Sequence, residues 1–201
     1  MPKDEPTWKK VAGSQLLEAA REGFIGDVPE ESGIYIWKLA VGPRTPFYQS
    51  SDLLEHVRSR LQTPVGLAKG HIGIVYNFEN LIIAGRDLTA DKIRTLSARA
   101  SDAEQGVQFR GYMKQFLHTL DDFTPALYVG ETGDLNQRVQ DHLNGETTFS
   151  KSIADYEALH FGNLDFYFCT IPFQTEDKSI RTTLEYIVTI TSLSGFGIRP
   201  G

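Results

Sequence analysis

The chain has 201 residues, 40% of them hydrophobic, enough for one compact core or for one core with a sizeable insertion. Its 20 basic and 26 acidic residues give a formal net charge of −6, which excludes a protein that coats nucleic acid through overall positive charge. No apolar run approaches the roughly 20 residues that span a bilayer and the first residues lack a secretion signal, so we expect a soluble cytoplasmic protein with no membrane partner.

The N-terminal part predicts a helix followed by a strand. Apolar residues at helical spacing predict a helix over 14–23, with Ser14 as its N-cap and Gly23 as its stop. We expect residues 1–30 to form a helical cap on the domain. The apolar, β-branched run at 33–37, Gly-Ile-Tyr-Ile-Trp, then predicts a short strand.

The block that follows this strand mixes helix and strand signals and shows neither repeats nor a flexible linker. We therefore expect it to fold onto the core. Its predicted elements are a helix at 51–61, two strands at 71–76 and 81–84 joined by a turn at 77–80, and two helices at 89–103 and 107–120.

A second apolar run, Ala-Leu-Tyr-Val-Gly at 126–130, predicts another strand. It leads through a turn into a predicted helix at 135–143, with Asp134 as the N-cap and an apolar face formed by every fourth residue. Arg138 and His142 are four residues apart, so they lie on one side of this helix about one turn from each other.

The C-terminal part predicts a helical stretch near 150–159 and a strand at 164–171. The single cysteine, Cys169, falls within that strand, which predicts a small buried side chain and excludes an intrachain disulfide. The last segment, 177–191, is β-branched, but its length and the spacing of its apolar residues favour a helix, which places Glu185 at the edge of a buried stripe.

Two tripeptides carry the strongest functional signal: Gly33-Ile34-Tyr35 and Tyr128-Val129-Gly130. Each lies in a predicted strand and presents one tyrosine, so Tyr35, Tyr128, Arg138 and His142 could converge on one site. Taken singly, such residues are ordinary: a tyrosine fills a half-buried strand position, and an arginine or histidine covers an exposed helix face. Their order and spacing favour a common site.

These motifs resemble the GIY-YIG nuclease family, with Arg138 and His142 matching the helix after the second motif and Glu185 matching the metal-binding glutamate. The resemblance implies an α+β fold: a small three-stranded antiparallel sheet flanked by helices, within one domain over 1–201. It covers about 31–41 and 125–195, so the 93 positions between the two motif tyrosines make 42–124 an insertion. No asparagine follows Glu185, where many family members have one.

For the chemistry, the resemblance implies that Tyr35 is the general base for the attacking water and that Arg138 binds phosphate oxygens and favours the ionised phenol. Glu185 would bind one divalent cation, Mg²⁺ or Mn²⁺. Tyr128 and His142 would complete the pocket through hydrogen bonds to the phosphate or the water.

The function expected from this resemblance is cleavage of DNA, as a restriction or other defence nuclease. Basic residues after the first motif are the best candidates for contacts with the DNA backbone, although solvated helix charges would explain them equally well; they are Lys38, Arg44, Arg58, Arg60 and Lys69. The main alternative is a catalytically weak, nucleic-acid-binding or regulatory subunit that binds a protein partner or a second copy through the insertion. A further alternative is a nuclease that acts on RNA or on branched DNA.

Overall fold

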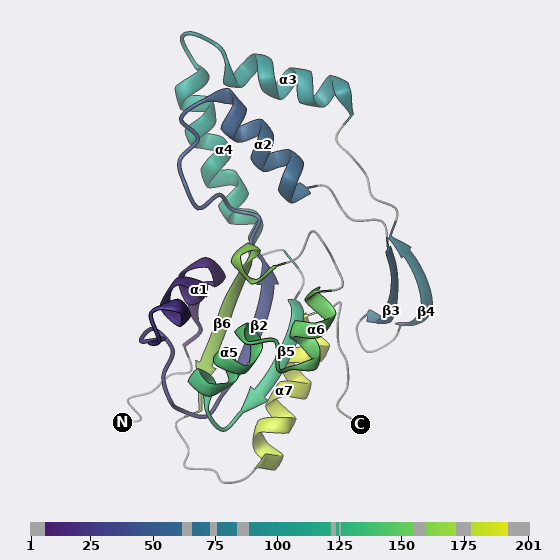
Figure 1. The fold of residues 1–201 in the computed structure, drawn as a ribbon. Helices are drawn as coiled ribbons and strands as arrows, with labels where there is room; N and C mark the ends of the chain where they lie inside the picture. Colours follow the sequence, from purple (N-terminus) through teal and green to yellow (C-terminus); the bar gives the residue numbers. More distant parts are fainter. Residues whose placement is uncertain are drawn as a thin grey trace, which may run out of the picture. The chain divides into compact units, whose positions relative to one another are not determined.

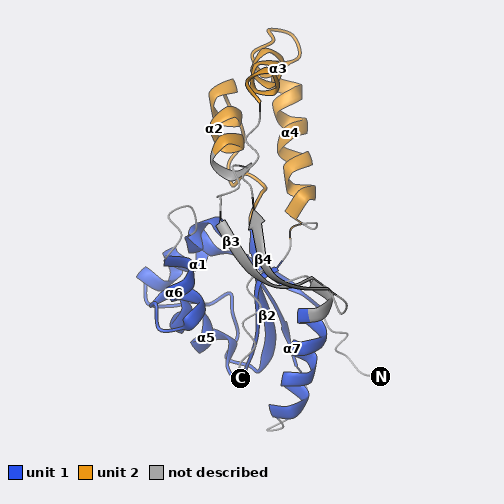
Figure 2. Cartoon of the chain, turned by 90° about the vertical axis from the view of Figure 1, so that its right-hand side faces the viewer, with its two compact units in different colours: residues 1–39, 70–78, 125–201 blue, residues 40–69, 79–124 orange. Residues whose placement is uncertain are grey.

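The computed structural model describes residues 7–61, 66–72, 76–83, 89–121, 124, 126–154, 160–171 and 178–192, with side chains outside 59–83 and 190–192. The chain divides into two compact units (Figure 2). The first contains residues 1–39, 70–78 and 125–201, and the second contains residues 40–69 and 79–124. Most of the block between the two tripeptides therefore belongs to the second unit.

A four-stranded sheet in the first unit has the order β1-β6-β2-β5 (Figure 1). Its strands are antiparallel and run over Lys9–Ala12 (β1), Gly33–Leu39 (β2), Ala126–Thr132 (β5) and Leu164–Thr170 (β6). The α+β class is confirmed. The predicted three-stranded sheet is wrong, because β1 pairs with β6 as a fourth strand.

This fourth strand lies within the part for which only a helical cap was predicted. Four residues are too few to establish an alternating pattern, and two of them are lysines. Val11 is buried, while Lys10 forms a 2.7 Å ion pair with Asp165 of β6, a carboxylate that is itself buried. A short edge strand with lysines is also typical of sheets that avoid pairing with other chains.

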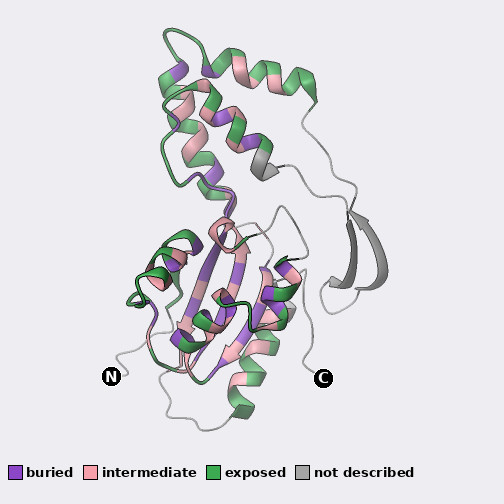
Figure 3. Cartoon of the chain, in the orientation of Figure 1, coloured by how far each residue is buried: buried purple, intermediate pink, exposed green. Residues whose placement is uncertain are grey.

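Helices cover both faces of the sheet. Gly13–Arg21 (α1), Leu135–Leu143 (α5) and Thr148–Ala154 (α6) lie on one side of β2, and Lys178–Ser192 (α7) lies on the other (Figure 2). The alternation of β2 explains this arrangement: Tyr35 and Trp37 enter the larger core, whereas Ile34 and Ile36 join a small cluster with Val188 of α7. A 3₁₀ turn, Phe161–Asn163 (η2), precedes β6. Figure 3 shows buried residues along the strands and on the faces of helices.

Of the three residues predicted to cap or end a helix, two are confirmed. Asp134 caps α5, where its side chain accepts a 2.9 Å hydrogen bond from the Gln137 N–H. Gly23 follows α1 with a φ of 80°, the left-handed conformation that glycine adopts without strain. Ser14 is not the N-cap, because α1 begins one residue earlier, and the side chain of Gln15 accepts a 3.2 Å hydrogen bond from the Ala12 N–H instead.

The second unit contains three helices with a core of their own. They are Ser50–Leu61 (α2), Ala90–Ala100 (α3) and Gly106–Leu120 (α4), and they confirm the three helices predicted in this block. Leu53, Val57 and Leu117 are among the buried core residues. The guanidinium of Arg110 on α4 connects three segments of the unit. It donates hydrogen bonds to the carbonyl of Phe47, before α2, at 3.1 Å and to that of Ala100, at the end of α3, at 2.5 Å.

A separate two-stranded sheet pairs Gly66–Ile72 (β3) with Tyr76–Ile83 (β4). Two strands were predicted here, but with the wrong limits: the expected turn at 77–80 lies inside β4. Its Asn-Phe-Glu-Asn composition is only a weak turn signal, which strand pairing overrides.

The C-terminal elements largely follow the predictions. The helix expected at 150–159 begins earlier, at Thr148, and its last predicted residues, 155–159, lie outside the described part. The final segment is helical, as its spacing indicated. Cys169 was predicted to be buried, but it is only half-buried; it is a free cysteine. Within the described ranges, every helix is too short or too polar to cross a lipid bilayer.

Candidate active site

The two tripeptides meet on neighbouring strands. Tyr35 of β2 lies directly opposite Gly130 of β5, and the rings of Tyr35 and Tyr128 have centroids 5.9 Å apart. A Cβ at position 130 would overlap the Tyr35 hydroxyl and would lie 2.5 Å from its Cζ. Glycine ends the second tripeptide because the Tyr35 side chain crosses the β5 backbone at this point.

Glycine in the first tripeptide serves the packing of α5. A Cβ at position 33 would lie 2.6 Å from the Cys169 carbonyl oxygen and 2.7 Å from Cδ1 of Leu135, the first residue of α5. The start of α5 is held further by its Asn136 side chain, which donates 2.7 Å hydrogen bonds to the carbonyls of Ile25 and Val28. These contacts fix where α5 presents Arg138 and His142.

His142 is fully buried and hydrogen-bonded at both ring nitrogens. Its Nε2 lies 3.0 Å from the Tyr35 hydroxyl, and its Nδ1 lies 2.7 Å from Oγ1 of Thr147. Aromatic rings surround it, including Trp37 and Phe149 edge-on at centroid distances of 6.0 and 5.5 Å. The helix, the sheet and the loop after α5 thus hold this imidazole in one orientation.

The surroundings keep His142 neutral. Burial is the main cause that lowers its pKa to about 3, and the positive charge of Arg138 lowers it further. At neutral pH the ring therefore carries one proton, and it can act as a donor through one nitrogen and as an acceptor through the other.

Tyr35 is 1% exposed, and its pKa lies well above the ordinary value. Burial is the largest cause, and Tyr128 and the charge of Glu185 act in the same direction, whereas Arg138 lowers the pKa. In the described state the phenol is therefore protonated. Arg138 has the electrostatic effect expected of it, but burial outweighs that effect.

Arg138 lies partly exposed beside the buried Tyr35. Its side chain is 38% exposed, and its closest carboxylate is that of Asp141, at 3.8 Å. The buried Nε has no hydrogen-bond partner among the described residues, a costly situation for a charged donor. A phosphate group can reach only the exposed part of this side chain, so the buried Nε is not the donor that would bind it.

Glu185 lies on the other side of the sheet from α5, and its negative charge adds to the effect of burial on the pKa of Tyr35. It lies half-buried on α7, and its pKa is raised first by burial and then by the neighbouring carboxylate of Glu131. Glu131, on β5, forms a 2.8 Å ion pair with Arg181, which lies on α7 like Glu185. Through the described ranges, no three His, Cys, Asp or Glu side chains gather in a group that could hold a metal ion.

The predicted nucleic-acid contacts are spread over both units. Lys38 lies on β2 with its amine 5.5 Å from the centre of the Tyr167 ring, and Arg44 and Arg58 are exposed in the second unit. The side chains of Arg60 and Lys69 lie outside the described part of the structure.

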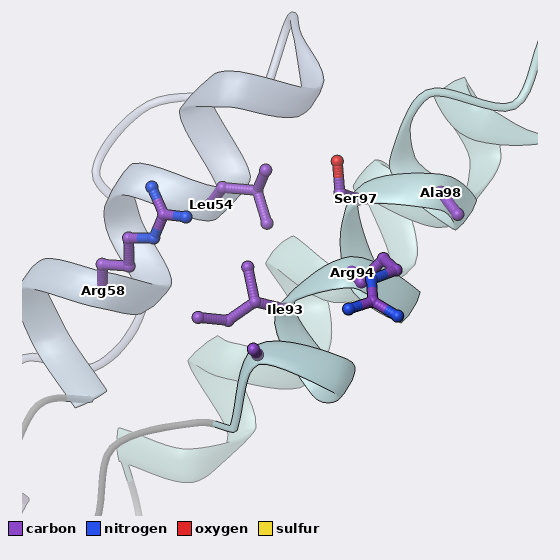
Figure 4. A pocket seen from close by; sticks show the side chains of 7 residues that line it. Leu54, Arg58, Ile93, Arg94, Ser97 and Ala98 are labelled. Carbon is purple, nitrogen blue, oxygen red and sulfur yellow. The ribbon is translucent and has the colours of Figure 1, made fainter.

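Arg58 lines an open groove of about 540 Å³ between α2 and α3 (Figure 4). Leu54 and Ile93 point toward each other across it, flanked by the guanidinium groups of Arg58 and Arg94. Ala90, Ser97 and Ala98 complete the lining. Arg94 was not predicted as a binding residue, because the sequence of one helix does not show which other helix packs beside it.

Sequence reasoning also missed Thr147, Ser150 and Glu131, which contact or lie close to the predicted residues. The spacing of Thr147 and Ser150 is that of a helix start, since the Ser150 N–H donates to Thr147 Oγ1 at 3.1 Å. That pattern could have predicted α6 but not the contact with His142.

No family model matches the chain, and no curated protein or solved structure matches it either.

Proposed function

We propose that the protein is a metal-dependent endonuclease of the GIY-YIG type that hydrolyses phosphodiester bonds in DNA. The observation that carries this proposal is the 3.0 Å contact between His142 Nε2 and the Tyr35 hydroxyl, with Tyr128 and Arg138 beside it. Residues from β2, β5 and α5 thus gather around one phenol, as the motif resemblance requires. Four polar or charged groups at one point exceed what a sheet needs for packing.

Each side chain has a role that its surroundings support. Arg138 binds the non-bridging phosphate oxygens, because its guanidinium is charged and its side chain is partly exposed. Tyr35, as the phenolate, takes the proton of the attacking water, and Arg138 and the neutral His142 stabilise its negative oxygen. Tyr128 is half-buried and orients the phosphate or the water.

The residues fit a divalent cation such as Mg²⁺ or Mn²⁺. Mg²⁺ typically binds to one or two carboxylates and completes its coordination with waters and substrate phosphate oxygens. Glu185 would hold it, assisted by Glu131, and the raised pKa of Glu185 marks a carboxylate whose negative charge lacks full compensation. When bound, the cation would stabilise negative charge on the scissile phosphate and on the leaving oxygen.

The charge distribution supports nucleic acid as the substrate despite the acidic total. Residues 40–124 contain ten basic and nine acidic residues, whereas the rest of the chain contains ten basic and seventeen acidic ones. The excess negative charge therefore lies outside the second unit. Arg58 and Arg94 both line the α2–α3 groove and are the side chains that we assign to contacts with a phosphate backbone; Arg94 also forms a 3.4 Å ion pair with Asp91.

The test is cleavage of supercoiled plasmid with Mg²⁺ or Mn²⁺, with EDTA as the metal-free control. We expect Tyr35→Phe and Glu185→Gln each to lower the rate by about 100-fold or more, the range for loss of a general base or of a principal charge-stabilising group. Tyr112→Phe and Glu18→Gln are matched controls, because both parent residues are exposed and neither shifts the pKa of Tyr35. Equal rates for a variant and its control would reject the assigned role.

A second candidate is a nucleic-acid-binding or regulatory subunit with weak cleavage. The observation that favours it is the burial of Tyr35, whose hydroxyl must become accessible to a water before it can act as a base. Salt-dependent DNA binding without cleavage at any metal concentration would favour this function. RNA and branched DNA belong in the same assay, because phosphodiester chemistry does not depend on the bases.

A further inference from the structure

A chain of hydrogen bonds continues beyond His142, away from Tyr35. His142 Nδ1 lies 2.7 Å from Thr147 Oγ1, which lies 3.0 Å from Ser150 Oγ. The Ser150 hydroxyl donates to the Thr147 carbonyl at 2.8 Å. Two backbone N–H groups join the network at 3.1 Å, from Thr147 to Ser150 Oγ and from Ser150 to Thr147 Oγ1.

Counting donors limits what Thr147 can do. The Ser150 proton is used on the Thr147 carbonyl, and the Ser150 N–H already donates to Thr147 Oγ1. The Thr147 hydroxyl has one proton, which can go to Ser150 Oγ or to His142 Nδ1. The choice decides the tautomer of His142.

The two distances to the ring favour one choice. Hydroxyl donors typically lie about 2.7–2.8 Å from their acceptors, and N–H donors about 2.9–3.0 Å from oxygen. The short 2.7 Å contact is on the Thr147 side, and the 3.0 Å contact is on the Tyr35 side. This pattern is the one expected for O–H···N at Nδ1 and N–H···O at Nε2.

The donor at Nε2 follows from this choice. A neutral imidazole carries one proton, so a ring that accepts from Thr147 at Nδ1 must donate from Nε2 in its 3.0 Å bond to the Tyr35 oxygen.

We propose that Thr147 is a positioning residue that donates to His142 Nδ1 and thereby places the imidazole proton on Nε2, where it is donated to the Tyr35 oxygen. His142 in this tautomer stabilises negative charge on Tyr35 but cannot accept the phenol proton through Nε2. The catalytic consequence rests on the proposed nuclease function, whereas the tautomer does not.

The tautomer can be measured by long-range ¹H–¹⁵N NMR of ¹⁵N-histidine-labelled protein without DNA or metal. His142→Gln identifies the signals, and the lowered pKa keeps the ring neutral near pH 7. We expect a protonated Nε2 and an unprotonated Nδ1. A protonated Nδ1 in the wild type would overturn the proposal, even if the protein cleaves nothing, because the spectrum does not depend on activity.

Variants then test the part played by Thr147. Thr147→Ser keeps the hydroxyl and should reproduce the wild-type spectrum, whereas Thr147→Val should move the two nitrogen shifts toward each other. In the plasmid assay Thr147→Val should lose about tenfold in rate, and Thr147→Ser should restore most of it. A Thr147→Val spectrum identical to that of the wild type would show that another group sets the tautomer.

Discussion

Gly130→Ala should disrupt the candidate site from the opposite strand. The added Cβ would overlap the Tyr35 hydroxyl and lie 2.9 Å from Cε1 of Tyr128, closer than carbon atoms pack. Tyr35 is buried beneath the neighbouring aromatic rings and cannot swing into solvent without opening the core. The substitution must therefore displace the ring and stretch its 3.0 Å bond to His142.

The expected cost follows from these two effects. Overpacking a well-filled core typically costs about 1–3 kcal/mol, and loss of a buried hydrogen bond costs about 0.5–1.5 kcal/mol. Replacing glycine removes backbone freedom from the unfolded chain, which offsets about 0.4–1 kcal/mol. We expect a net loss in the free energy of unfolding of about 0.5–4 kcal/mol.

Urea unfolding followed by tryptophan fluorescence measures this change, because Trp37 lies in the same core. Gly133→Ala is the matched control: it lies three residues along the chain, and an added Cβ there would meet nothing within 4 Å. We expect the control to stay within about 0.5 kcal/mol of the wild type. Equal unfolding midpoints for the two variants would refute the argument that Tyr35 requires glycine at position 130.

Two further predictions concern pH and salt. Because His142 has a folded-state pKa of about 3, below its unfolded value of about 6.5, it contributes stability that is present above pH 6.5 and is lost as the pH falls toward 3. His142→Gln should reduce the slope of unfolding free energy against pH in this range by up to about 1.4 kcal/mol per pH unit. His160→Gln, at an exposed position, is the control and should leave the slope unchanged. Equal slopes in the two variants would contradict the assignment of this effect to His142. If the α2–α3 groove contacts DNA, the double variant Arg58→Ala/Arg94→Ala should reduce the slope of log K against log salt by about two, as measured by fluorescence anisotropy. Exposed Arg21→Ala in the first unit is its control, and an unchanged slope in the double variant would exclude the groove as a phosphate contact.

The local elements could be predicted because their signals are short-range. The apolar runs of β2 and β5, the helical spacing in α3 to α5, and the cap at Asp134 each depend on residues within a few positions of one another. The same holds for placing Arg138 and His142 on one side of a helix. The two tripeptides could also be predicted to lie at one site, because the family resemblance treats them as parts of the same motif.

Tertiary structure determined the strand pairing, the burial and the neighbouring charges of these side chains. β1 joins the sheet by pairing residues near position 10 with residues near 167, and no local pattern in four residues encodes that partner. The raised pKa of Tyr35 and the lowered pKa of His142 come mainly from burial, which many side chains from distant segments create together. Glu185 was placed on a helix from its spacing, but only the packing of α7 against the opposite face set its distance from the tyrosines and brought it beside Glu131. Composition and spacing are properties of the chain, whereas desolvation and charge proximity depend on which segments meet in three dimensions.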